Sequence, residues 1–311
     1  MSFSAILALG QTALELALFN SLTVLALFLS YEMLNVCDLS TDGCYALGAA
    51  VGAVVAIAGH PWLSIPAAMG AGMISGLVTA ILQTRMGVNS LLAGIIVNTG
   101  LYSVNIWIMG GSSLLNMNKT VTVFTMLKEA LKGTPIAGLY ALIIGLIAVA
   151  AVIAFQSGFL RTKLGLAIRA TGDNPDMVRS SSINPAFTTT VGLCISNSFT
   201  ALSGCLLAQS QKSVSVDIGS GMVTVALASL LIGGVFMGRR SIPLRAVGAV
   251  LGAFVFRLVY TIALRFNLPA FMLKLISSVI VVIAISGPYL KKEFPNIRRR
   301  WAVRFGKGGA V

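Results

Sequence analysis

Long apolar runs recur from one end of the 311-residue chain to the other. Each holds about 18 or more mostly apolar residues, the length that an α-helix needs to cross the hydrocarbon core of a bilayer. The strands of a membrane β-barrel are much shorter, about ten residues of alternating polarity. Because the bilayer core offers no hydrogen-bond partners to the backbone, runs of this length span it as α-helices. The sequence therefore predicts an all-α polytopic membrane protein.

The runs divide into about nine predicted spans, separated by short polar segments. Three pairs of glycines within them, Gly48/Gly52, Gly72/Gly76 and Gly248/Gly252, have the spacing that lets two helices approach closely. We therefore expect helix packing at these positions. The spans cover approximately residues 13–35, 42–59, 62–84, 89–110, 136–160, 185–210, 219–238, 246–265 and 269–289.

The basic residues are distributed unevenly between the two sides of these spans. The formal net charge of +13 raises the question of nucleic-acid binding, but the charges lie in the short breaks and at the end of the chain, beside membrane lipid. Fifteen Lys and Arg fall on the side of the C-terminus and five on the other. Since cytoplasmic loops are enriched in Lys and Arg, we expect a cytoplasmic C-terminus and, with nine spans, an external N-terminus. This gives a transmembrane domain over 1–290 and a basic cytoplasmic tail over 291–311.

Polar residues within or between the spans indicate a solute pathway, because each costs free energy in hydrocarbon unless it faces protein or water. The segment "CDLSTDG" lies at a break between spans, where the alternative is a surface loop. A weakly similar segment, "VSVDIGSG", lies in the second half, as in transporters with inverted repeats and discontinuous helices. Two polar stripes lie on single helix faces, where interhelical hydrogen bonding is the alternative. The predicted pathway residues are Asp38, Ser40, Asp42, Asn98, Tyr102, Asn105, Asn197, Thr200 and Asp217.

No constellation for catalysis is visible in the sequence. It contains no GxxxxGK[ST] phosphate loop and no HExxH motif, and its single histidine, His60, lies at a predicted helix end. The four cysteines lack the spacing of a metal site. We expect no catalytic residue, no metal and no cofactor in this chain, and no ATP hydrolysis by the chain alone.

A hydrophilic stretch, residues 161–184, interrupts two of the long apolar runs. It contains six charged side chains. Lys163 to Thr171 is predicted to form a short helix, which Gly172 ends. Asn174 is a good N-cap and Pro175 suits the first turn of a second helix. Such an ordered polar hairpin is predicted to be a docking surface for a soluble partner.

This hairpin resembles the cytoplasmic loop of permease subunits of ABC importers of the branched-chain amino acid/ribose permease superfamily. In that family a Gly-x-x-x-Arg-Ala-x-Gly-x-Asn-Pro run couples the permease to its ATPase. "CDLSTDGCYALGA" is similar to the family's Asp-Leu-Ser/Thr-x-Asp/Glu-Gly motif. "LLAGIIVNTGLYSVNIWIMG" and "LKLISSVIVVIAISGP" look like the single-permease branch, which includes aromatic amino acid importers. The resemblance implies ATPase coupling for Gly165, Arg169, Ala170, Gly172, Asp173, Asn174 and Pro175.

The resemblance also implies partners and a mechanism. The partners would be ABC ATPase subunits that bind ATP and Mg²⁺, an external solute-binding lipoprotein and a second permease copy, in a prokaryotic cytoplasmic membrane. The solute would be small and polar, most readily an amino acid. A sugar or nucleoside importer is an alternative, and so is an ion-coupled secondary transporter, in which Asp38, Asp42 and Asp217 would serve as ion sites.

The charge asymmetry predicts which side of the membrane each loop faces. In a cysteine-depleted background, a cysteine introduced at Ser181 should react with an impermeant thiol reagent only after the membrane is opened. A cysteine at Lys128 should react in intact cells, because the spans between the two positions place them on opposite sides. Labelling of both positions from one side would contradict the predicted topology.

Overall fold

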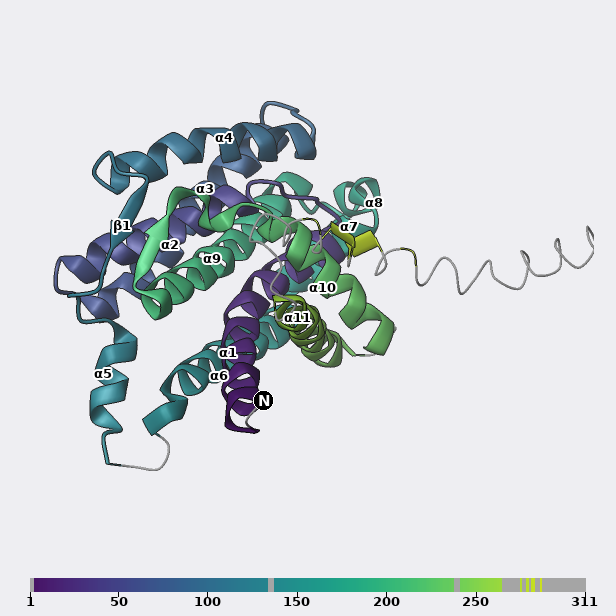
Figure 1. Cartoon of the computed structure of the whole chain (residues 1–311). Coiled ribbons are helices and arrows are strands. Elements are labelled where there is room, and N and C mark those ends of the chain that lie inside the picture. Colours follow the sequence, from purple (N-terminus) through teal and green to yellow (C-terminus); the bar gives the residue numbers. More distant parts are fainter. Residues whose placement is uncertain are drawn as a thin grey trace, which may run out of the picture.

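The computed structural model describes residues 3–133, 137–237 and 241–264, together with single positions between 275 and 286 (Figure 1). The elements are helical apart from two short strands. In chain order they are α1 (Phe3–Leu27), continued by a π-helical turn (Phe28–Met33), α2 (Thr41–Ile57), α3 (Pro61–Thr84), α4 (Ser90–Ile108), β1 (Leu114–Asn116), α5 (Val123–Ala130), a 3₁₀ turn (Ala137–Leu139), α6 (Tyr140–Phe159), α7 (Lys163–Asp173), α8 (Pro175–Ser180), α9 (Pro185–Gln211), β2 (Ser213–Ser215), a second 3₁₀ turn (Val216–Gly219), α10 (Met222–Met237) and α11 (Ile242–Leu264).

Seven helical segments of the described residues are long and apolar enough to cross a membrane, and α2 is a shorter apolar helix. They correspond to the first eight predicted spans. Their ends agree to within a few residues, except that α1 begins at Phe3 and not near residue 13. The ninth predicted span, 269–289, and the basic tail lie outside the described residues. The prediction of an all-α polytopic membrane protein is confirmed.

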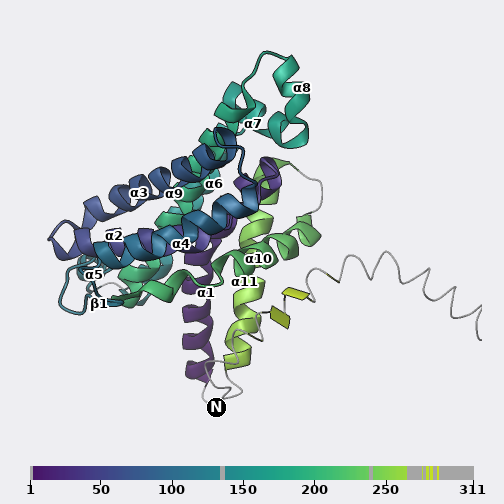
Figure 2. The same ribbon diagram turned by 90° about the horizontal axis from the view of Figure 1, so that it is seen from above.

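The short elements between the spans lie at two ends of the molecule. The hairpin formed by α7 and α8 stands out beyond the long helices at one end, which we call the hairpin end (Figure 2). At the other end β1 pairs antiparallel with β2, with Leu115 opposite Val214. Basic residues from different loops lie at both ends. At the hairpin end, Arg85 lies near Asn184 and Arg245 pairs with Glu32. At the opposite end lies Lys212, whose backbone carbonyl accepts a hydrogen bond from the Met117 N–H. Which end is cytoplasmic stays a prediction.

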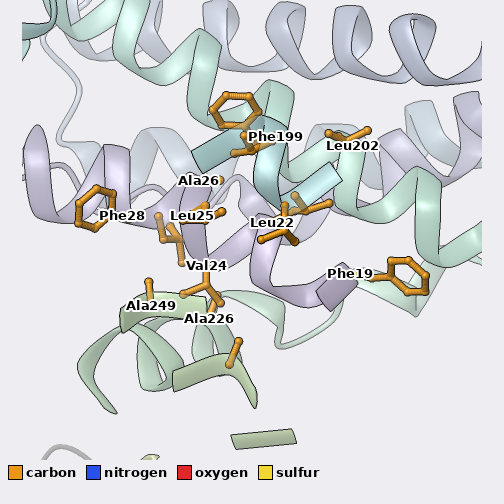
Figure 3. Packing of buried hydrophobic residues seen from close by; sticks show 14 of the residues in the cluster. Phe19, Leu22, Val24, Leu25, Ala26, Phe28, Phe199, Leu202, Ala226 and Ala249 are labelled. Carbon is orange, nitrogen blue, oxygen red and sulfur yellow. The ribbon is translucent and has the colours of Figure 1, made fainter. Parts of the chain in front are cut away.

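Helix α1 lies at the centre of the hydrophobic core. The side chains from Phe19 of α1 to Phe28 of the π-helical turn pack between α9 on one side and α10 and α11 on the other (Figure 3). Side-chain hydroxyls of α9 also donate to α1 carbonyls, Ser196 to Ala26 at 2.8 Å and Ser203 to Phe19 at 2.6 Å. The polar stripe on α9 therefore forms interhelical hydrogen bonds, one of the two alternatives that its sequence left open.

The paired glycines lie where helix backbones touch, as predicted. Gly48 and Gly52 of α2 face Ala201 and Cys205 of α9, while Gly72 of α3 faces Asn197 of the same helix. A side chain at any of these positions would overlap α9. Helix α9 is thus packed closely on α2 and α3 through small residues, which is how membrane helices gain contact without a hydrophobic driving force.

Two glycines of α3 allow this packing to be tested with a matched pair. A Cβ at Gly72 would overlap Asn197 and lie 2.6 Å from the Ala201 side chain, whereas a Cβ at Gly70 meets nothing within 4 Å. We expect Gly72→Val to lower the free energy of unfolding by about 1–3 kcal/mol through overpacking. Gly70→Val should leave it nearly unchanged. Thermal unfolding of both variants in the same detergent measures the difference, and equal midpoints would contradict the close approach.

Candidate functional site

The chain leaves helical structure between the π-helical turn and α2, at residues 34–40. It turns at Asn35, whose φ of 56° is a left-handed conformation that Asn tolerates better than most residues. Asp38 then lies buried, with 1% of its surface exposed. Its carboxylate accepts bonds from the Ser40 backbone N–H and the Asn197 side-chain amide, both at 2.8 Å. The alternative of a surface loop is therefore wrong, because this segment is held inside the protein against α9.

A second interruption precedes α10. Strand β2 and the 3₁₀ turn at Val216–Gly219 lead to Gly221, after which α10 begins. Asp42, in the first turn of α2, accepts bonds from the backbone N–H groups of Gly221 at 2.9 Å and Val223 at 2.8 Å. These donors belong to the start of α10, where backbone N–H groups have no intrahelical acceptor. The two interrupted segments that the sequence singled out therefore meet, and the Asp42 carboxylate joins them.

A polar pocket of about 320 Å³ lies where these segments meet α4. Helix α4 contributes two asparagines: Asn105 is 1% exposed and donates to the Gly43 carbonyl at 3.2 Å, and the Asn98 side chain lies beside Gly43. The Tyr102 ring, also on α4, is half exposed. Asp217, from the second interrupted segment, also lines the pocket. The lining residues are Asp42, Gly43, Ala46, Asn98, Thr99, Tyr102, Asn105, Val216, Asp217 and Ser220.

The pocket brings together five of the nine predicted pathway residues, namely Asp42, Asn98, Tyr102, Asn105 and Asp217. The other four lie in the buried packing beside it and do not line it. Their polar groups bond to protein: Asn197 to Asp38, the Ser40 hydroxyl to Thr79 at 3.3 Å and Thr200 to the Ser196 carbonyl at 3.3 Å. The pathway role of all nine residues stays a prediction.

Sequence reasoning missed several lining residues. Ser220 lies three positions after Asp217, in the segment compared with "CDLSTDG", so that comparison contained a usable signal. Thr99 follows Asn98 on α4, but its hydroxyl donates to the Ile95 carbonyl at 2.8 Å, as serine and threonine commonly do within helices. Nothing in the sequence distinguishes it from other such residues.

The hairpin is built by capping side chains at each helix start. Thr162 accepts from the Gly165 N–H at 3.2 Å at the start of α7, and Asn184 caps α9. Asn174 accepts from the N–H groups of Asp176 and Met177, with Pro175 in the first turn of α8. The predicted cap and proline positions are therefore confirmed.

The predicted role of Gly172 as a helix breaker is wrong. Helix α7 continues through Gly172 to Asp173, and the chain becomes extended at Asn174, where φ is −157°. Gly172 instead touches the backbone after α1: a Cβ there would overlap the Met33 carbonyl and lie 2.9 Å from the carbonyl carbon of Leu34. Gly165 similarly lies against Phe159 and Leu160 at the end of α6. Both glycines are required for close packing, not for an unusual backbone angle.

The remaining predicted coupling residues lie toward the outer face of the hairpin. Asp173, Asn174 and Pro175 are exposed, while Arg169 and Ala170 are half-buried. The opposite face, with Ala167 and Ile168, is buried. The hairpin thus presents a mainly polar surface on which Leu166 and Met177 are also exposed, and its inner side touches the segment that leads to Asp38.

Comparisons with known proteins agree with this arrangement. The family described as branched-chain amino acid transport system / permease component matches residues 12–285. A tyrosine transport system permease protein of Clostridioides difficile (strain R20291) is 30% identical over 267 residues, 86% of either chain. A fructose import permease protein of Bifidobacterium longum (strain NCC 2705) is 26% identical over 293 residues, 86% of this chain and 76% of the relative. No solved structure matches the chain significantly.

The two aspartates of the pocket are predicted to differ in their structural importance. Asp42→Ala leaves two backbone donors of α10 without their acceptor, so we expect it to lower the free energy of unfolding by about 2 kcal/mol. Asp217 is exposed, so Asp217→Ala should change it by less than about 0.5 kcal/mol. Thermal unfolding in one detergent compares the two. An equal loss in both variants would show that Asp42 does not hold the start of α10.

Proposed function

The chain belongs to the family of permease components of branched-chain amino acid transport systems, and we propose that it carries a small amine-bearing solute, most simply an amino acid. As a member it is a multi-pass membrane protein and a permease component of an ABC-type import system. That family implies ATPase and binding-protein partners. We propose that ATP and Mg²⁺ are bound by the ATPase subunits and that the C-terminus is cytoplasmic.

The polar pocket is the observation that carries the substrate proposal. It contains the carboxylates of Asp42 and Asp217, and among the described residues no Lys, Arg or His lines it. Backbone N–H groups already offset part of the charge of Asp42. Asp217, exposed at the wall, is the group that we propose meets an ammonium, since a charge-assisted hydrogen bond is stronger than a neutral one.

Two further features favour an amino acid with an aromatic side chain. The half-exposed Tyr102 ring offers a stacking surface beside the two carboxylates. The C. difficile relative is named as a tyrosine transport permease. A sugar would be bound by neutral hydrogen bonds and would gain less from two acidic groups.

We propose that the α7–α8 hairpin docks on the ATPase and that two copies of the permease assemble around one pathway. The hairpin touches Met33 and Leu34 through Gly172, and residues 34–40 connect that contact directly to the start of α2. A shift of the hairpin would therefore move the wall of the pocket. Helix α4 presents exposed Leu92, Ile96 and Trp107, which we propose face the second copy.

The test is uptake by the reconstituted importer. The permease, copurified with its ATPase, is placed in liposomes with the external binding protein, and ATP-dependent uptake of labelled tyrosine and fructose is measured. We expect tyrosine uptake that needs ATP hydrolysis, and Asp217→Asn should reduce it about tenfold, as the loss of about 1.4 kcal/mol implies. Arg169→Glu should reduce ATPase capture, whereas Lys132→Glu, at the opposite end, should not.

Three results would contradict this proposal. Uptake of fructose and not tyrosine would exclude the amine-bearing substrate while leaving the importer intact. Uptake driven by an ion gradient without ATP would favour the secondary-transporter alternative. Unchanged ATPase capture and uptake in Arg169→Glu would remove the hairpin from coupling. Expression and unfolding midpoints of each variant, measured on the same samples, separate these outcomes from misfolding.

A further inference from the structure

We propose that a long apolar groove between α3, α6 and α9 holds one acyl chain of an anionic bilayer phospholipid, whose phosphate lies near Lys128. The groove has a volume of about 700 Å³ and is separate from the polar pocket. Among the described residues its lining is apolar except for the Ser198 hydroxyl, the Trp62 indole N–H and backbone groups. This proposal does not depend on which solute the permease carries.

The groove exists because α6 packs mainly on α1. Helices α3 and α9 are in close contact through glycines, whereas α6 meets α9 through large side chains. The rings of Phe155 and Phe199 make an edge-on contact at 5.8 Å between their centres. The space between this contact and α5 is left without protein side chains among the described residues.

The length of the groove fits one leaflet of a bilayer. Its lining runs along α3 from Trp62 to Met73, along α6 from Ile144 to Phe155, and along α9 from Ile195 to Leu206. Each stretch rises about 16 Å at about 1.5 Å per residue, about half of a hydrocarbon core of about 30 Å. Trp62, with 63% of its surface exposed, marks the end opposite the hairpin, where aromatic residues lie at the membrane interface.

The charge at this end favours an anionic headgroup. Helix α5 closes the end of the groove with Val123 and Leu127, and a bond from the Val123 N–H to Gln209 of α9 at 3.2 Å holds it there. The next residue, Lys128, is exposed and lies 5.7 Å from the centre of the Tyr140 ring at the start of α6. Lys132 follows, so this segment carries a net positive charge despite Glu129. A phosphate at the interface would lie beside these ammonium groups while its acyl chain follows the groove.

The experiment uses photoreactive phospholipids in nanodiscs. The permease is placed in discs that contain a trace of phosphatidylglycerol or phosphatidylcholine with a diazirine in one acyl chain, and the labelled peptides are mapped after illumination. We expect labelling of α6 and α9 at the groove above that of the exposed face of α11 at Leu258 and Ile262, and more from phosphatidylglycerol than from phosphatidylcholine. Even labelling of all lipid-facing helices, or no difference between the lipids, would overturn the proposal.

Two substitutions and a matched control separate the acyl-chain site from the headgroup site. Ala151 lines the groove and Ala150, its exposed neighbour on α6, does not. Ala151→Phe should reduce groove labelling to the level of the exposed face of α11, whereas Ala150→Phe should leave it unchanged. Lys128→Gln, on an exposed position, should abolish the preference for phosphatidylglycerol and retain labelling by both lipids. Unchanged labelling in Ala151→Phe would overturn the acyl-chain site.

A second permease copy is the competing occupant of the groove, and crosslinking identifies it. Ile147 lines the groove and is 63% exposed. If lipid fills the groove, a cysteine at Ile147 in a cysteine-depleted background should form no disulfide between copies. Such a disulfide, together with absent lipid labelling, would assign the groove to the subunit interface and overturn the proposal. If Ala151→Phe fails to fold, the wild-type comparison of lipids and Lys128→Gln still decide the outcome.

Discussion

The structure depends on the satisfaction of backbone groups where helices begin inside the protein. Both α2 and α10 start beside non-helical segments, and hydrocarbon would leave their first N–H groups without acceptors. The Asp42 carboxylate meets this requirement by accepting from Gly221 and Val223, and Asp38 does the same for Ser40. Because Asp42 belongs to α2 and its donors to α10, a single side chain fixes the relative position of two interrupted helices. The polar pocket lies beside this junction, so its geometry follows from the same constraint.

The same junction connects the pocket to the hairpin. Residues 34–40 begin where Gly172 touches Met33 and Leu34, and they end where Asp38 bonds to Asn197 of α9. The segment is short and held at both ends by close backbone contact or by charged hydrogen bonds. A long exposed loop could change its own conformation when the hairpin moves and leave its far end in place, but this segment is too short and too firmly held to do so. This gives a physical route by which a soluble partner at one end can act on a pocket within the membrane, provided that two arrangements of the segment exist.

The sequence predicted the parts of this fold that depend on local patterns. Helix spans follow from apolar length, close contacts from the Gly48/Gly52 and Gly72/Gly76 spacing, and the start of α8 from Asn174 and Pro175. It did not predict what depends on partners far along the chain. Because glycine often ends helices, the sequence predicts a helix breaker at Gly172, whereas in the structure this glycine is needed for space against Met33. Likewise, the bond of Asp42 to Gly221 joins residues 179 positions apart, and no local signal assigns that acceptor. Of the predicted pathway residues, periodicity placed Asn98, Tyr102 and Asn105 on one face but could not tell that Thr200 lies in the packing beside the pocket.

Helix α9 explains why one chain can have both a polar pocket and an apolar groove. Its small and polar residues face α1, α2 and α3, where Ser203 donates to the Phe19 carbonyl and Cys205 touches Gly52. Its large residues Phe199 and Leu202 line the groove toward α6. Small residues allow backbones to approach and leave no room for lipid, whereas large ones hold the next helix away and leave spaces that lipid can enter. The side of α9 that packs on α2 thus supports the pocket, and the side toward α6 is left for the bilayer.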